Sequence, residues 1–322
     1  MLEQISPLWD VYLLNKERGN PLVLATLVKT IGSSYKKAGA MMLIEQDRTT
    51  HGLISGGCLE ADVAEHAMTV FESDKAQQIE YDLSDESIFG LGAGCDGTIY
   101  IVLQLLTGDY LPFSALNPLA KYTQPPELYI EYKVDSKYPI GSFYVTKNNQ
   151  ITEQPVGFHA ATKTKPFKFI PPPHIIIFGA GTDVTPLCQL LNLLHWQVTI
   201  VDHRIARLQL IQQDERTEIV HANGDTLAET LNELKFDAAI IMTHNLARDA
   251  QYLKLSATTS CGFVGLLGPP ARRDKVLKIA NIKMPEIALK LRAPVGLNLG
   301  GRMPENIALS IVAQLQAYIY QT

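Results

Sequence analysis

Short apolar segments are separated by polar and glycine-rich turns along the whole chain, and the order of helix and strand patterns differs between its two halves. In the first half, apolar residues recur at helical spacing over Pro7–Arg18 and again over Leu59–Phe71. Between and after these helices lie apolar stretches typical of strands: Leu22–Lys29, Met41–Glu45 and Thr98–Leu105. We therefore expect an α+β domain over residues 1–106.

A β-rich connecting region is expected over residues 107–170. Its extended segments are Glu127–Val134 and Gly141–Val145, followed by a turn at Asn148 and Asn149. The pattern leaves open whether these strands extend the first domain or wrap around the second.

The second half, residues 171–322, begins with the stiff spacer Pro171–Pro173 and then alternates strand and helix patterns. The final helix is expected to start near Pro304 and to end at about Tyr320. The expected strands are His174–Phe178, Gln197–Asp202, Thr217–His221, Asp237–Thr243 and Gly262–Leu266. This alternation predicts a Rossmann-like, doubly wound parallel sheet with helices on both faces.

The turn after the first of these strands has the pattern of a dinucleotide site. Gly179 permits a tight turn, and Gly181 lets the backbone approach a pyrophosphate at the start of the next helix. Asp202 ends the following strand, where the acid that accepts from a ribose hydroxyl stands in such folds. The third glycine position is Val184, and a fold of this kind does not by itself require a bound nucleotide.

Cys58 follows the double glycine Gly56–Gly57 and stands at or beside the start of an amphipathic helix. The helix dipole favours the thiolate form at such a position, which makes Cys58 a candidate reactive or ligating sulfur. A small, buried and inert cysteine fits the same pattern equally well. Cys95 lies in a second glycine cluster, and the two thiols are candidates for one shared pocket.

Three further places in the chain are candidates for binding a ligand. Ser33 and Ser34 lie in a loop with free amides and two lysines that can hold a phosphate, although a solvated loop has the same composition. His244 follows a strand at the carboxyl edge of the sheet, where it can bind a ligand or cap the next helix. Arg302 adjoins two glycines before the last helix and is either an anion contact or a surface residue.

Composition narrows the class of protein further. A net charge of −5 gives no reason to expect a nucleic-acid or acidic-lipid surface, and the apolar runs are too short to span a bilayer. Four cysteines without paired spacing favour a reducing cytoplasm, with Cys188 and Cys261 as packing residues. The sequence contains neither a His-Glu-x-x-His motif nor paired Cys-x-x-Cys spacing, and its eight histidines are scattered, so no metal site is expected. We expect a soluble cytoplasmic protein.

Several separate motifs of the chain resemble the XdhC/CoxI family, the maturation factors of xanthine dehydrogenase and carbon monoxide dehydrogenase. In chain order, the motifs that resemble the family are Ala25–Tyr35, Ser55–Asp62, Phe178–Gly181, Val201–Arg204, Gly262–Gly268 and Ala293–Ala308. Five positions depart from the family pattern, and most of them lie in its nucleotide half: Ala38, Thr182, Asp183, Val184 and Met303.

The resemblance implies a homodimeric helper that holds the molybdenum cofactor, a pterin dithiolene that can carry a nucleotide, and delivers it in sulfurated form to a molybdenum hydroxylase apoenzyme. It implies that Ser33, Ser34 and the glycine loops cradle the pterin phosphate. Cys58 and Cys95 would lie near the molybdenum or hand over sulfur from a donor protein, and the second domain would hold a nucleotide. The alternative is an NAD-dependent oxidoreductase, for which Gly179, Gly181 and Asp202 are the motivating residues.

Overall fold

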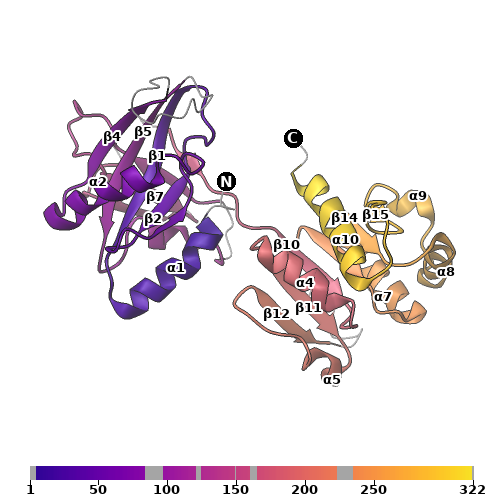
Figure 1. Ribbon diagram of the computed structural model, residues 1–322. Coiled ribbons are helices and arrows are strands. Elements are labelled where there is room, and N and C mark those ends of the chain that lie inside the picture. The colour runs from indigo at the N-terminus through magenta and orange to yellow at the C-terminus, as the bar shows by residue number, and fades with distance from the viewer. Residues whose placement is uncertain are drawn as a thin grey trace. The chain divides into compact units, whose positions relative to one another are not determined.

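The chain forms two compact units, Met1–Pro171 and Pro172–Thr322, which are treated separately below (Figure 1). The structure is a computed structural model that describes residues 5–83, 97–120, 125–148, 150–159, 165–222 and 235–320. Within these ranges, none of the helices combines the length and the apolar character needed to cross a bilayer.

An antiparallel sheet of five strands forms the centre of the first unit, in the order β3-β2-β1-β5-β4. The two long strands β1 and β5 pair at its centre and bury apolar residues on both faces, which explains why apolar residues dominate both sequences instead of strictly alternating with polar ones. The strands are β1 (Leu22–Gly32), β2 (Met41–Ile44), β3 (Thr50–Gly52), β4 (Gln77–Asp82) and β5 (Gly97–Leu106).

Two helices pack on opposite faces of this sheet, each with its own hydrophobic core (Figure 1). Helix α2 (Glu60–Ser73) packs on the face that carries Val23 and Ala25. Helix α1 (Ile5–Arg18) packs on the other face, which carries Leu22 and Leu24. The alternation along β1 therefore sets which helix each side chain meets.

A second, four-stranded sheet with the order β8-β7-β6-β9 shares the core of α1. Leu128 and Phe143 are buried in that core, so these strands belong to the first unit. Its strands and the adjoining 3-10 helix η2 are β6 (Glu127–Ile130), β7 (Phe143–Lys147), β8 (Gln150–Gln154), β9 (Phe167–Lys168) and η2 (Phe113–Leu116).

The second unit contains a parallel six-stranded sheet in the order β12-β11-β10-β13-β14-β15. Counted along the chain this is 3-2-1-4-5-6, the Rossmann order, whose direction of winding reverses between β10 and β13. The strands are β10 (His174–Phe178), β11 (Gln197–Asp202), β12 (Thr217–His221), β13 (Ala238–Ile241), β14 (Phe263–Leu266) and β15 (Leu291–Arg292).

Helices cover both faces of this sheet. One face packs against α4 (Val184–Leu193) and α10 (Pro304–Ile319), and the other packs against α7 (Leu246–Thr258) and α8 (Pro270–Ala280). Two short helices complete the unit, α5 (Ile205–Leu208) and α9 (Met284–Ile287). The predicted fold class, an α+β domain followed by a Rossmann-like parallel sheet, is confirmed.

Candidate functional site

The thiol of Cys58 is exposed and borders a cavity of about 170 Å³, which we name the Cys58 cavity. Three of the predicted site residues, Ser34, Gly56 and Cys58, lie together in its wall. The other residues that line it are Tyr35, Ile54, Ser55, Leu83 and Ile99. Cys95 and the rest of its glycine cluster up to Asp96 lie outside the described residues, so a shared pocket for the two thiols stays a prediction.

A buried carboxylate holds the loop that presents Cys58. Glu60, the first residue of α2, is 7% exposed and turns its side chain back into the loop. Its oxygens accept hydrogen bonds from the hydroxyl of Ser55 at 2.6 Å and from several loop amides, including those of Gly56 and Gly57. The amides of Gly56 and Gly57, which the family resemblance assigns to the pterin phosphate, therefore already have a carboxylate partner.

These contacts also set the charge state of Glu60. Burial by itself raises the pKa of a carboxyl group, but the hydrogen bonds from Ser55 and from neighbouring amides outweigh it here. The net result lowers the pKa of Glu60 to about 2. Glu60 is thus a fixed negative charge at the start of α2, where the helix dipole favours an acid.

Tyr35 adds an aromatic surface to the Cys58 cavity. Its side chain packs over Gly56, where a Cβ atom would come within 3.2 Å of the ring. Gly56 has a φ of 128°, so both the space and the backbone conformation require glycine at this position. Tyr35 itself is 69% exposed, which leaves much of the ring free to contact a ligand.

The predicted anion-binding loop lies between the Cys58 cavity and a larger one. Ser33 is exposed, and the hydroxyl of Ser34 donates to the carbonyl of Lys36 at 2.7 Å. The amine of Lys36 lies 5.7 Å from the centre of the Tyr35 ring. The loop thus brings the Tyr35 ring to the Cys58 cavity, with the Lys36 cation next to that ring.

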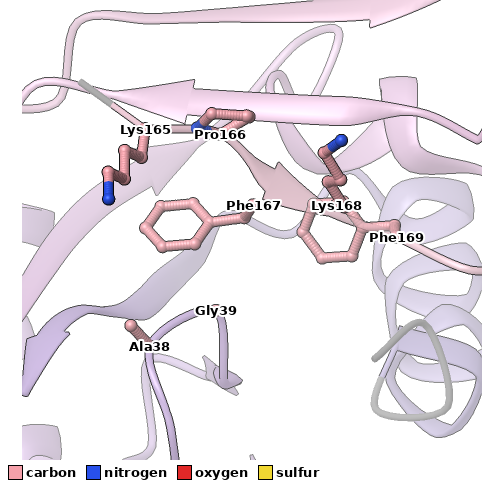
Figure 2. Close-up of a pocket in the computed structure, with 7 residues that line it drawn as sticks. All are labelled: Ala38, Gly39, Lys165, Pro166, Phe167, Lys168 and Phe169. Carbon is pink, nitrogen blue, oxygen red and sulfur yellow. The ribbon is translucent and has the colours of Figure 1, made fainter. Parts of the chain in front are cut away.

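The larger cavity, of about 360 Å³, lies where this loop meets β9, and we name it the Phe167 cavity. Its lining residues are Ala38, Gly39 and the run from Lys165 to Phe169. Figure 2 shows the Phe167 ring directed toward the turn at Ala38 and Gly39, whereas the Lys168 amine points away from that turn. Lys168 pairs with Glu127 at 3.2 Å. This lining has no thiol, hydroxyl or carboxylate, so of the two cavities formed by described residues, the Cys58 cavity is the one with a nucleophilic side chain in its wall.

The three cysteines among the described residues differ sharply in exposure, which gives a direct test. Cys188 and Cys261 are 6% and 3% exposed, and burial raises the pKa of Cys188 to about 12 and also raises that of Cys261. We expect iodoacetamide to modify Cys58 in the folded protein at least about tenfold faster than either buried thiol. Residue-resolved mass spectrometry measures the three rates. Equal rates before unfolding would contradict this description of the Cys58 loop.

In the second unit, four predicted residues gather at the carboxyl edge of the parallel sheet. Gly179 has a φ of 123°, and a Cβ atom there would lie 2.6 Å from the carbonyl oxygen of Met242. Gly179 is therefore required where β10 meets β13 in the tight turn, as the sequence predicts. Gly181 lies in the same turn, and the ends of β11 and β13 place Asp202 and His244 at this edge.

Asp202 is engaged by its own chain. The Arg204 guanidinium donates to both carboxylate oxygens, at 2.9 and 2.6 Å, and the Ala180 amide donates at 2.7 Å. Burial favours a higher pKa for the Asp202 carboxyl, but the hydrogen bonds from Arg204 and Ala180 outweigh it and lower that pKa. In this conformation the carboxylate that would accept from a ribose hydroxyl already holds an arginine.

The carboxylate of Asp183 lies beside Gly181, the glycine at which the sequence predicts the approach of a pyrophosphate. A Cβ atom on Gly181 would lie 2.5 Å from Oδ1 of Asp183. The Asp183 side chain therefore occupies the space that the missing Cβ of Gly181 leaves open. Oδ2 of Asp183 contacts Nε2 of His244 at 2.8 Å, joining the two strand ends at the switch point of the sheet. Arg302 is exposed in the segment between β15 and α10.

Sequence reasoning missed Glu60, Tyr35 and Asp183 as members of these sites. The acid of Glu60 is ordinary for a first helical turn, and only its reversed side chain gives it a role. Within the described residues there is no cluster of three or more His, Cys, Asp or Glu side chains able to hold a metal ion.

These two units, one carrying an exposed thiol beside a cavity and the other a Rossmann-type sheet, define a two-domain α/β protein with candidate binding sites in each domain. Residues 16–82 match the model of the XdhC and CoxI family, and residues 175–315 match the model of the XdhC Rossmann domain. The chain belongs to the XdhC and CoxI family.

Relatives match along nearly the whole chain. A protein of Bacillus subtilis named as a probable xanthine dehydrogenase subunit is 28% identical over 307 residues, covering 91% of this chain and 92% of that protein. The molybdenum cofactor insertion chaperone PaoD of Escherichia coli is 23% identical over 303 residues, 92% of this chain and 83% of that protein. The crystal structure of a xanthine dehydrogenase from Bacillus halodurans matches with a TM-score of 0.76 and 27% identity, covering 97% and 96% of the two chains.

Proposed function

We propose that this protein holds the molybdenum cofactor and delivers it to a molybdenum hydroxylase apoenzyme, with the Cys58 cavity receiving the metal end. The observation that carries the proposal is the exposed Cys58 thiol on a loop fixed by a buried carboxylate at the edge of a cavity. The similarity to a protein named a molybdenum cofactor insertion chaperone, over 92% of the chain, supports the same role.

The number of protein ligands suits a cargo more than a resident metal. Resident metal sites typically use three or four side-chain ligands, whereas the described residues offer Cys58 as a single accessible thiol. The cargo proposed here brings its own dithiolene sulfurs, so one thiolate from the protein is enough to engage the metal. A single protein–metal bond also breaks easily, as delivery to a second protein requires.

The size of the Cys58 cavity agrees with a partly enclosed ligand. Sites that bury most of a small molecule usually measure ~300–1,000 Å³, and the Cys58 cavity measures about 170 Å³. It therefore accommodates one end of the cofactor, while the planar pterin has the exposed Tyr35 ring beside it for stacking. The same exposed thiol is open to a sulfur-donor protein, so the proposal includes delivery of the sulfurated form.

Cofactor retention tests the proposal directly. We expect the protein, purified anaerobically from a molybdate-fed host, to carry molybdenum together with a fluorescent pterin oxidation product. Cys58→Ser should carry at least about tenfold less molybdenum per chain, because serine removes the thiol that we propose engages the metal. Metal analysis and pterin fluorescence give the two readouts.

Glu65→Gln is the matched control, since Glu65 is an exposed residue of the same unit that pairs with Arg48. It should retain wild-type molybdenum. Absence of both metal and pterin from the wild-type protein would overturn the delivery role. Equal retention by wild type and Cys58→Ser would remove Cys58 from the site.

The second candidate is an NAD-dependent oxidoreductase, favoured by the Rossmann strand order of the second unit. The pairing of Asp202 with Arg204 and the position of Asp183 beside Gly181 both weigh against it, because they occupy the polar contacts that a dinucleotide uses. We therefore rank cofactor delivery first.

A further inference from the structure

The hydrogen bonds of Glu60 are centred on the residue that carries the thiol. Oε2 accepts from the amide of Gly57 at 3.0 Å and from the amide of Leu59 at 3.2 Å, the two residues on either side of Cys58. Oε1 accepts from the amides of Ile54 and Ser55 at 3.0 and 2.9 Å, which fixes the start of the same loop. A single carboxylate thus restrains the backbone before and after Cys58.

Ser55 strengthens this restraint because its hydroxyl both donates and accepts. It donates to Oε2 of Glu60 at 2.6 Å and accepts from the amide of Leu59 at 3.0 Å. Ile54, Ser55, Leu59 and Glu60 are buried, whereas Gly56, Gly57 and Cys58 are exposed. The loop is therefore anchored from beneath by polar contacts while its tip faces the solvent and the Cys58 cavity.

We propose that Glu60 is the positioning residue of this site, holding the Cys58 thiol at the cavity edge so that it can engage the metal end of the ligand. This inference rests on the proposed function for the identity of the ligand, but the positioning itself does not. Glycines at positions 56 and 57 give the loop its shape at the expense of stiffness, and Glu60 restores that stiffness. Without the carboxylate, the loop amides lose their common acceptor.

Glutamine is the informative substitution at this position. Glu60→Gln keeps the shape of the side chain but replaces one acceptor oxygen with an NH₂ group, which would face amide donors instead of accepting from them. Ser55→Ala is a milder second variant that removes one hydroxyl and leaves the carboxylate in place. Glu65→Gln makes the same chemical change at an exposed position of α2 and is the matched control.

A nitroxide attached to Cys58 reports positioning separately from folding. In a Cys95→Ser background, with Cys188 and Cys261 buried, we expect a restricted label in the wild-type loop and a mobile label in Glu60→Gln. Hydrogen exchange of the peptide covering residues 54–59 should accelerate at least about tenfold in Glu60→Gln and less in Ser55→Ala. Exchange in the β4 and β5 peptides should stay unchanged, which separates a loosened loop from a loosened unit.

Molybdenum retention, measured in chains with Cys58 unmodified and Cys95 intact, completes the test. We expect Glu60→Gln to retain at least about tenfold less molybdenum than wild type and Glu65→Gln to match wild type. An unchanged label, or a mobile label with full molybdenum retention, would overturn the positioning role. If the wild-type protein carries no molybdenum, the proposed function fails, while the label and exchange results still decide whether Glu60 orders the loop.

Discussion

Replacing Asp249 with alanine is expected to lower the free energy of unfolding of the second unit by about 3–5 kcal/mol. Asp249 lies on α7 and is 1% exposed, and its Oδ2 accepts from the Arg272 guanidinium of α8 at 2.6 Å. Its Oδ1 accepts from the hydroxyl and the amide of Thr243 at 2.5 and 3.2 Å. Alanine leaves a largely buried guanidinium and a buried amide without their acceptor, and that loss gives the large effect.

The neighbouring ion pair on α8 provides the control. Asp274 pairs with Arg273 at 2.8 Å, but its side chain is 63% exposed. Because solvent screens such a pair, Asp274→Ala should change the free energy of unfolding by less than about 1 kcal/mol. Urea unfolding with peptide-resolved hydrogen exchange in Pro172–Thr322 isolates the second unit from the first. Similar urea midpoints for the two variants would show that the buried Asp249 pair stabilises the second unit no more than the exposed Asp274 pair does.

The effect of Asp249 extends to the edge of the sheet that carries the second candidate site. Thr243 immediately precedes His244, whose φ of 61° is uncommon for a residue with a side chain. The hydrogen bonds from Thr243 to Asp249 hold this segment in place. We therefore expect hydrogen exchange around His244 to rise in Asp249→Ala even under conditions where the unit remains folded.

The regular strands of the second unit were predictable because local pattern alone determines them. β10, β11 and β12 begin and end at the predicted residues, since each is a short apolar or branched segment bounded by polar turns. Five strands were missed across the two units. β3, β9 and β15 span three, two and two residues, which is too few for any periodicity. β4 and β8 are largely polar, and Tyr81 of β4 is the single buried residue in the two strands.

The candidate sites were only partly predictable because their chemistry depends on contacts between distant residues. The turn at Gly56 and Gly57 and the tight turn at Gly179 follow from glycine alone. The packing of Tyr35 on Gly56, by contrast, joins two loops across 21 positions of the sequence, and no local pattern encodes it. The contact between Asp183 and His244 likewise requires that β13 lie beside β10.

The position of Asp183 also makes the ligand preference of the second unit testable. In Asp183→Ser, we expect NADH to bind roughly 30-fold more tightly than in the wild-type protein. Two like charges ~8 Å apart near a protein surface repel by about 2 kcal/mol at an effective dielectric constant of ~20, which corresponds to that ratio. Serine removes this charge beside Gly181, retains a good N-cap residue for α4, and frees the His244 ring to donate to a phosphate.

NADH fluorescence titration measures the two dissociation constants, and Glu215→Ser is the control. Glu215 is exposed in the turn before β12, at the opposite edge of the parallel sheet, so this variant changes the net charge equally without touching the switch point. Its NADH affinity should equal that of wild type. Micromolar binding by the wild-type protein would mean that Asp183 is no obstacle and would restore the dehydrogenase as a candidate. Failure of both wild type and Asp183→Ser to bind at millimolar NADH would eliminate that candidate. In the variant the carboxylate beside Gly181 is gone, so its charge could no longer explain the lack of binding.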